Sequence, residues 1–408
     1  MQNIDFKHLA QRYQTPLYVY DFPKIQENFL AFKEAFAGRK SLICYALKAN
    51  SNLSLIAHLA QMGAGADCVS FGEVRRALLA GIPKYKIIFS GVGKRDDEIE
   101  GALREDILFL NVESFGELKR IEKIAQALNL QARISVRVNP NIDAKTHPYI
   151  STGMAKNKFG VEIEEAKEMY LYIKHSNALE AVGIHFHIGS QICDLSPFIE
   201  ASNKIAKLLT SLLALGLSIK FFDVGGGLGV CYDDENPIAL YDYAQGILAS
   251  LGGLEPTIIC EPGRRIVAES GYFLTRVIGE KQNSHKRFVI VDGAMNDFLR
   301  PSLYEAYHRS TLLDSKSLDS SLCDIVGPIC ESGDYLAKDV LLPSTQEGDL
   351  IVFEGAGAYG YSMSSNYNTR TKPAEVALTE NGIKLIRGRE SLEDLFAKEL
   401  ECYESNKA

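Results

Sequence analysis

The fold of this chain can be inferred from one stretch, Ser41-Leu-Ile-Cys-Tyr-Ala-Leu-Lys-Ala-Asn50, in which an apolar run ends at a lysine. The run from Leu42 to Leu47 is typical of a parallel strand that is buried on both faces. Lys48 stands where this strand stops, and a buried ammonium is costly unless it is paired or used covalently, as in a Schiff base. Taken alone, Lys48 is better explained as a side chain that reaches water beyond the strand end.

The same apolar pattern returns seven more times along the chain, with helical patterns between the runs. Strands are expected at residues 42–47, 66–69, 86–89, 107–110, 132–138, 181–186, 220–224 and 257–260. Eight strands that alternate with helices match a closed parallel barrel better than an open doubly wound sheet. We therefore predict an α/β fold in which residues 24–265 form a (β/α)8 TIM-type barrel.

The pattern changes near residue 265 to short alternating runs that are interrupted by Gly, Pro and Asn. Such runs are typical of an all-β domain of the sandwich or Greek-key kind. A further strand is expected at residues 17–20, before the barrel, and it could pair into this second domain. We therefore predict a discontinuous β domain made of residues 1–23 and 266–408.

Composition restricts the class of protein. A chain of 408 residues with a net charge of -8 and no long basic block does not suit nucleic acid or an anionic membrane surface. Residues 1–16 lack the apolar core of a signal peptide, and no run is long enough to span a membrane. The 8 cysteines include no Cys-x-x-Cys pair, so neither a zinc site nor a redox dithiol is indicated. We expect a cytoplasmic protein that acts on small molecules.

Polar side chains follow each predicted strand of the barrel. In such barrels the active site is built at the carboxyl ends of the strands. The residues at these ends are Lys48, Asp67, Ser70, Ser90, Asn111, Glu113, Arg137, Asn139, His185, His187, Asp223, Glu261 and Arg264. One rim of the barrel is therefore expected to carry the functional groups.

Glycines follow the seventh predicted strand in Asp223-Val-Gly-Gly-Gly-Leu-Gly229. Glycine lets backbone N–H groups approach an anion closely, and the loops after strands seven and eight are a frequent phosphate site in barrels. Glu261-Pro-Gly-Arg264 would supply the second half of that site. The spacing of the glycines in residues 223–229 matches neither a Walker loop nor a Rossmann fingerprint. A purely structural glycine turn is the alternative.

His185 and His187 lie on one face of the sixth predicted strand, because strand side chains alternate. As metal ligands they would indicate a metal-dependent hydrolase, which needs further ligands on other strands. An imidazole can equally stack on a flat cofactor ring. A lysine, a phosphate cradle, a stacking imidazole and a carboxylate at Glu261 together describe a site for pyridoxal phosphate, in which the acid holds the pyridine nitrogen protonated. We therefore expect this cofactor and no metal.

Seven motifs stand out along the chain: Tyr45–Asn50, His185–Gln191, Gly225–Gly229, Glu261–Arg264, Met295–Tyr304, Gly327–Ser332 and Gly355–Tyr359. They resemble the motifs of the diaminopimelate decarboxylases, a family in the alanine-racemase-like barrel class of pyridoxal phosphate enzymes, and the resemblance runs almost end to end. The chain departs from the family at Phe71, where glycine is more usual, and we expect that change to affect packing only.

The resemblance implies a role for each matching residue. Lys48 would hold the cofactor covalently and His187 would stack on its ring. The other cofactor-binding residues would be Asp67, Ser190, Gly226, Gly227, Glu261, Gly263, Arg264 and Tyr359. The substrate-binding residues would be Arg264, Arg300, Tyr304, Glu331 and Tyr359. Cys330 would donate a proton, and it would reach the active site from the partner subunit of a homodimer with shared active sites.

The implied reaction is decarboxylation of meso-2,6-diaminopimelate to L-lysine and CO2, the last step of lysine biosynthesis. An arginine such as Arg300 suits a distal carboxylate and an acid such as Glu331 suits a distal ammonium. The alternatives are a decarboxylase of carboxynorspermidine, ornithine or arginine, and a catalytically silent barrel that binds pyridoxal phosphate or regulates a partner enzyme. Cys330 could also be a small buried hydrophobe.

Residues 153–160 are expected to form a mobile lid.

Overall fold

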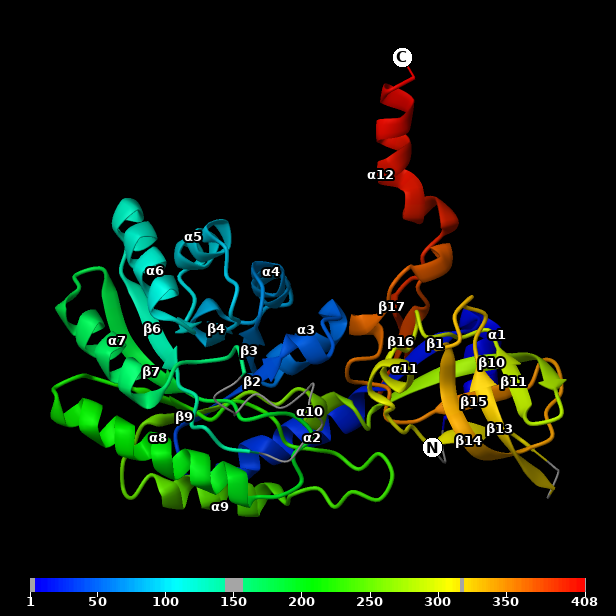
Figure 1. Cartoon of the computed structure of the whole chain (residues 1–408), viewed down its shortest axis with the longest axis horizontal. Coiled ribbons are helices and arrows are strands. Elements are labelled where there is room, and N and C mark those ends of the chain that lie inside the picture. Colours follow the sequence, from blue (N-terminus) through cyan, green and yellow to red (C-terminus); the bar gives the residue numbers. More distant parts are fainter. Residues whose placement is uncertain (1–3, 144–156, 316–318, 408) are drawn as a thin grey trace. The chain divides into compact units, whose positions relative to one another are not determined.

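The computed structural model describes residues 4–143, 157–315 and 319–407. The chain divides into two compact units (Figure 1). The barrel unit consists of Gln26–Cys231 and Glu235–Ile266, and the β unit consists of Met1–Ile25, Tyr232–Asp234 and Val267–Ala408. Among the described residues, no helix has both the length and the apolar character that a membrane span requires.

The barrel unit contains the closed barrel of eight parallel strands that the sequence predicts. The strands are β2 (Ser41–Ala46), β3 (Gly65–Cys68), β4 (Ile87–Phe89), β5 (Phe109–Val112), β6 (Ala132–Arg137), β7 (Leu179–His185), β8 (Phe221–Asp223) and β9 (Thr257–Cys260). β9 pairs in parallel with β2 and closes the barrel. Their side chains are nearly all buried, because a parallel barrel is covered on both faces.

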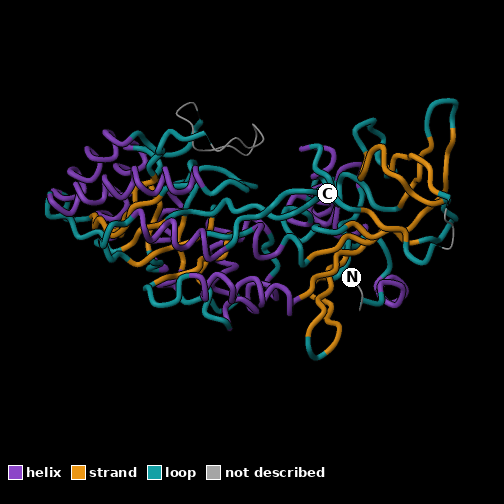
Figure 2. The backbone as a smooth tube through the Cα atoms, turned by 90° about the horizontal axis from the view of Figure 1, so that it is seen from below, coloured by secondary structure: helices purple, strands orange, loops and turns teal. Residues whose placement is uncertain are grey.

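Helices surround these strands (Figure 2). They are α2 (Phe22–Ala35), α3 (Leu53–Gln61), α4 (Phe71–Leu79), α5 (Asp96–Glu105), α6 (Phe115–Leu128), α7 (Ile163–His175), α8 (Ser196–Ala214), α9 (Leu240–Ser250) and α10 (Arg264–Val267), with short 3-10 turns η1 (Leu47–Ala49) and η2 (Lys84–Lys86). Phe71 on α4 packs where a Cβ on Gly101 of α5 would lie 2.5 Å from its ring. The departure from the family at Phe71 is therefore matched by a glycine on the neighbouring helix.

Two helices begin with the same cap, and the cap turns a glutamate back toward a strand end. The hydroxyls of Ser70 and Ser114 accept hydrogen bonds from the N–H groups of Glu73 and Glu117. The two carboxylates in turn accept hydrogen bonds from the N–H groups that precede each cap, at 2.7 Å and 2.8 Å. This is a variant of the capping box. It places both carboxylates at the mouth of the barrel, beside the ends of β3 and β5.

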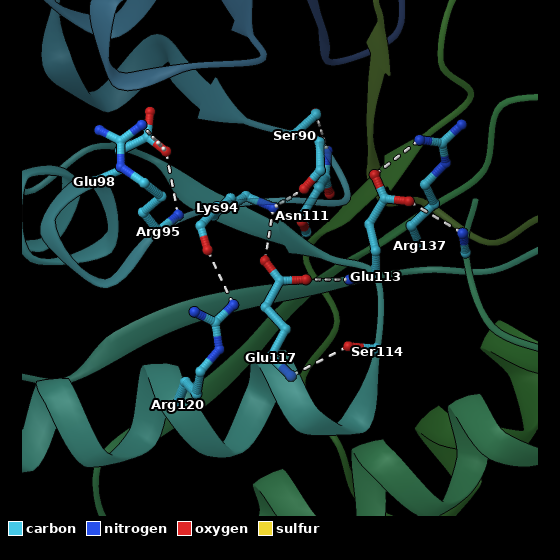
Figure 3. A network of polar contacts seen from close by, with 12 residues as sticks. Ser90, Lys94, Arg95, Glu98, Asn111, Glu113, Ser114, Glu117, Arg120 and Arg137 are labelled. Carbon is cyan, nitrogen blue, oxygen red and sulfur yellow. Dashed lines mark hydrogen bonds and ion pairs between the residues drawn. The ribbon is translucent and has the colours of Figure 1, made fainter. Parts of the chain in front are cut away.

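A buried polar network occupies the ends of β4 to β6 (Figure 3). The Lys94 ammonium donates to the carbonyl oxygens of Gly91 and Asn111 and lies 2.8 Å from Glu117. Beside it, Glu113 forms an ion pair with Arg137 at 2.9 Å. Each side chain of these two ion pairs is almost inaccessible to solvent. Every buried charge in the network therefore has a partner. An unpaired charge would be costly there, because the dielectric constant of the interior is low.

Replacement of Lys94 by methionine should lower the free energy of unfolding by about 3–5 kcal/mol, because the buried Glu117 charge would lose its partner. Urea denaturation followed by circular dichroism measures this loss. The matched control is Lys84→Met, which removes an ion pair with Asp106 whose two side chains are about half exposed and should cost less than about 1 kcal/mol. Equal losses in the two variants would contradict the prediction.

The β unit is built on a nine-stranded mixed sheet in the order β14-β13-β11-β10-β1-β16-β17, with β15 paired to β10 and β12. The strands are β1 (Leu17–Asp21), β10 (Gly271–Gln282), β11 (Arg287–Val291), β12 (Ser310–Leu312), β13 (Ser320–Val326), β14 (Tyr335–Pro343), β15 (Leu350–Phe353), β16 (Ala374–Thr379) and β17 (Gly382–Arg387). β1 lies between β10 and β16, so the early strand does pair into the second domain.

The β unit also contains helices, which the expectation of an all-β domain missed. They are α1 (Phe6–Tyr13), α11 (Arg300–Tyr304) and α12 (Leu392–Ser405), with the 3-10 turns η3 (Tyr361–Met363) and η4 (Tyr367–Thr369). In α1, Phe6 and Leu9 join the core under β1 and β10. In α12, Ser391 and Asp394 form a capping box, and no residue of the helix is buried. The capping box therefore accounts for where α12 begins.

Candidate active site

Lys48 lies in the 3-10 turn that directly follows β2, at the mouth of the barrel. Its ammonium is 3.0 Å from the carboxylate of Asp67, which is fully buried at the end of β3. Burial, and next the nearby Glu261, raise the pKa of Asp67, whereas Lys48 lowers it. The lysine is therefore held at the strand end by a buried partner, and its side chain is still 37% exposed toward the mouth.

Glu261 follows β9 and is buried, with Oε2 3.5 Å from His185 Nε2. Its other oxygen, Oε1, has no hydrogen-bond partner among the described residues. Burial alone would raise the pKa of this carboxyl group, but His185 and Lys48 hold it below its usual range. Glu261 is therefore ionised and offers one oxygen to a cationic N–H group, which is the chemistry a pyridinium nitrogen requires.

Asp223 completes a buried cluster with His185 and Glu261, whose ligand atoms all lie within 4.8 Å of one another. Burial, together with the charge of Glu261, raises the pKa of Asp223 well above its usual range, while the N–H of Gly225 donates to it at 3.0 Å. A protonated Asp223 beside an ionised Glu261 leaves one negative charge on the pair. One imidazole and two carboxyls could in principle bind a metal, so the expected lack of a metal stays a prediction.

His187, just beyond β7, accepts a hydrogen bond at Nδ1 from the N–H of Gly226, at 3.1 Å. Burial, and then the charges of Arg137 and Lys48, lower the pKa of His187 well below its usual value. The ring is therefore neutral, and its own hydrogen lies on Nε2. A neutral imidazole fixed in this way can stack on a flat ring.

Glycine is required in the loop after β8. A Cβ on Gly226 would lie 2.2 Å from the carbonyl oxygen of Glu261, and a Cβ on Gly227, whose φ is +116°, would lie 2.4 Å from that of Gly189. The guanidinium of Arg264 donates to the hydroxyl of Ser190 at 3.1 Å. The loops after β7, β8 and β9 thus meet, and the close approach of their glycine backbones is what a phosphate site would need.

Two residues at this mouth were given no specific role by the sequence interpretation, although Arg137 was among the side chains expected at the rim. Arg137 pairs with Glu113 and lies over the ring of Phe159 at 4.6 Å. Glu73 is held by the N–H of Val69, and the charges of Asp67 and Lys48 both act on it. The only sequence signal for Glu73 is Ser-x-x-Glu directly after a strand, which indicates a helix cap and not a site.

Glu73→Gln should remove a pH dependence of stability. Burial raises the pKa of Glu73 from 4.5 to about 7, so the folded protein holds this proton more tightly than the unfolded chain. Stability due to this group is full below the unfolded pKa and declines as the pH rises toward the folded one. Gln is neutral at every pH and can still accept the hydrogen bond from Val69. Between about pH 5 and pH 8, the free energy of unfolding of the variant should therefore rise by about 1 kcal/mol relative to that of wild type, a value reduced for the partial exposure of Glu73.

Urea denaturation at both pH values tests this prediction. Glu100→Gln is the control, because Glu100 is an exposed partner of Arg104 on α5. If wild type and Glu73→Gln depend on pH equally, Glu73 does not titrate near neutrality.

The remaining predicted site residues lie in the β unit. Arg300 is buried on α11, and its guanidinium lies 5.9 Å from the ring centre of Tyr304. Cys330 is exposed, and its backbone N–H donates to Asn368 at 2.9 Å. Glu331 is also exposed, and Tyr359 is half-buried with a φ of 58°. Cys330 is thus not the buried hydrophobe of the alternative interpretation.

The predicted lid is described only in part. Residues 153–156 lie outside the described residues. At the end of this stretch the N–H of Gly160 donates to Glu113 at 3.1 Å. That bond connects the end of the stretch to the buried network of β5 and β6.

Comparison with known proteins agrees with this geometry. Residues 22–268 match the family model described as pyridoxal-dependent decarboxylase, pyridoxal binding domain. The diaminopimelate decarboxylase of Helicobacter pylori strain J99 is 61% identical over 401 residues, which are 98% of this chain and 99% of that protein. The enzyme of Campylobacter jejuni is 60% identical over 97% of this chain and 98% of its own length.

A solved structure of the Helicobacter pylori diaminopimelate decarboxylase, complexed with L-lysine, superimposes with a TM-score of 0.95 at 61% identity. It covers 97% of this chain and 100% of its own. The barrel with a β domain is therefore confirmed, and so is the expected pyridoxal cofactor. The chain belongs to the diaminopimelate decarboxylase family of pyridoxal-dependent decarboxylases.

Proposed function

We propose that this protein is a carboxy-lyase that decarboxylates meso-2,6-diaminopimelate to L-lysine and CO2 with pyridoxal phosphate, in the last step of lysine biosynthesis. The observation that carries the proposal is the meeting of Lys48, Asp67, His187 and Glu261 at one barrel mouth. The family membership supplies the substrate. We further propose a homodimer with shared active sites in the cytoplasm, and both stay predictions.

Each of the barrel residues has a separate role in binding the cofactor. Pyridoxal phosphate, when bound, supplies an electron sink for the electron pair that remains when a carboxylate leaves as CO2. Lys48 would form the covalent link, and Asp67 would orient its amine. Glu261 would hold a proton on the ring nitrogen, and His187 would stack on the ring. Ser190, Gly227, Gly263 and Arg264 would donate to the phosphate, and Gly226, whose N–H is bonded to His187, would line the phosphate site.

The β unit supplies the substrate groups. Arg300 and Tyr304 bind the distal carboxylate, Glu331 binds the distal ammonium, and Arg264 and Tyr359 contact the part of the substrate near the cofactor. Cys330 of the partner subunit donates the proton that replaces CO2 on the carbon. Carboxynorspermidine, ornithine and free arginine have no distal carboxylate that could pair with the buried Arg300. They are therefore less suitable substrates than meso-diaminopimelate.

Release of CO2 by the purified protein with pyridoxal phosphate tests the proposal. Meso-diaminopimelate should be turned over, whereas ornithine, arginine and carboxynorspermidine should react at least about 100-fold more slowly, because a buried arginine without its carboxylate partner is costly. Faster turnover of a polyamine precursor would overturn the assignment of Arg300 and Glu331. A lack of turnover with every substrate would favour the silent barrel.

A further inference from the structure

His308, which lies between α11 and β12, is buried and makes a hydrogen bond through each ring nitrogen. Nε of Arg300 donates to His308 Nε2 at 3.2 Å, and His308 Nδ1 lies 2.9 Å from the carbonyl oxygen of Glu354. Arginine nitrogens only donate, so His308 Nε2 must accept. The hydrogen of the neutral ring is then on Nδ1 and points at Glu354. The contacts thus select one tautomer of His308.

Aromatic rings hold this pair from the sides. Phe298 and Tyr232 pack edge-on against His308, with ring centres 4.5 Å and 5.0 Å away. The Arg300 guanidinium lies 5.0 Å from the centre of the Tyr232 ring. Gly355, at a φ of +69°, leaves room for Tyr232, since a Cβ there would lie 3.1 Å from that ring. Rotation of the His308 or Arg300 side chain would therefore clash with these packed rings.

The direction of this bond restricts how Arg300 can bind a carboxylate. A guanidinium takes a carboxylate in two parallel bonds, either side-on through Nε and one terminal nitrogen or end-on through the two terminal nitrogens. His308 occupies the Nε edge. Only the end-on geometry then remains for a bidentate carboxylate.

We propose that His308 is a positioning residue for substrate specificity, which holds Arg300 so that its terminal nitrogens bind the distal carboxylate of the amino-acid substrate end-on. This inference rests on the proposed function and names a residue that acts on the substrate only through Arg300. The carboxylate remains on the product L-lysine, because the other carboxyl group leaves as CO2. Binding of substrate and product should therefore depend on His308, whereas binding of the diamine cadaverine should not.

Two substitutions separate the two bonds of His308. Asn keeps a donor near Nδ1 for Glu354 but has no acceptor at the position of Nε2, whereas Gln places its carbonyl oxygen near Nε2. His308→Asn should raise the KM for meso-diaminopimelate and the Ki of L-lysine by about tenfold each, with kcat changed less than about threefold and the Ki of cadaverine unchanged. His308→Gln should restore KM to within about threefold of wild type.

A double-mutant cycle tests the route through Arg300. In an Arg300→Lys background, which lacks the planar fork, His308→Asn should change KM less than about twofold. KM and Ki do not depend on the amount of folded enzyme, so partial unfolding cannot imitate the pattern. Turnover of meso-diaminopimelate by wild type decides the proposed function separately. An unchanged KM in His308→Asn, a fall in kcat alone, or a further tenfold loss in the Arg300→Lys background would overturn the inference.

Discussion

Lys48→Ala is expected to abolish both the visible absorbance of the lysine-bound cofactor and CO2 release from meso-diaminopimelate. Lys48 offers the amine at the barrel mouth that Asp67 holds at 3.0 Å, and alanine has no group that could form the link. We expect turnover to fall by at least about 10⁴-fold, because the covalent link orients the cofactor as well as activating it. Absorbance spectroscopy on the purified variant, followed by a CO2 assay, measures both effects.

Lys40→Ala is the matched control for this experiment. Lys40 is exposed and precedes β2, so it lies at the opposite end of the same strand from Lys48. Its loss should leave both the absorbance band and the rate unchanged. If Lys48→Ala retains the band, then another amine holds the cofactor and the assignment of Lys48 is wrong.

Cys330→Ala should reduce turnover by about 10²–10⁴-fold, the usual contribution of a positioned acid, while the cofactor absorbance is retained. The thiol is exposed in the β unit, which leaves it accessible to a second copy of the chain. Steady-state CO2 release measures the loss. Cys402→Ala, which removes an exposed thiol from α12, is the control and should leave the rate unchanged. A full rate in Cys330→Ala would show that another group protonates the carbon.

Mixing the two inactive variants tests whether the active sites are shared. In a symmetric dimer, equal amounts of Lys48→Ala and Cys330→Ala chains would give hybrids with one intact site, and about a quarter of the wild-type activity should return. Native mass spectrometry confirms that the subunits have exchanged. Exchange without recovered activity would place Cys330 in the active site of its own chain and contradict the shared arrangement.

The sequence by itself determined the barrel and most of the residues at its mouth. β9 occupies the residues that the apolar pattern predicts. Lys48, His187 and Glu261 all stand at strand ends, and parallel strands in a closed barrel bring these ends to one rim. Periodicity is a local property of the chain, so it can be read without knowledge of distant contacts.

Only the tertiary structure decided the protonation states and the partners of these groups. The neutral state of His187 and the near-neutral pKa of Glu73 depend on burial and on charges that other strands contribute. The bond between His308 and Arg300 depends on how α11 turns back toward the end of β15. Electrostatic energies vary with distance and with exclusion of water, and neither quantity is encoded in a local pattern of residues.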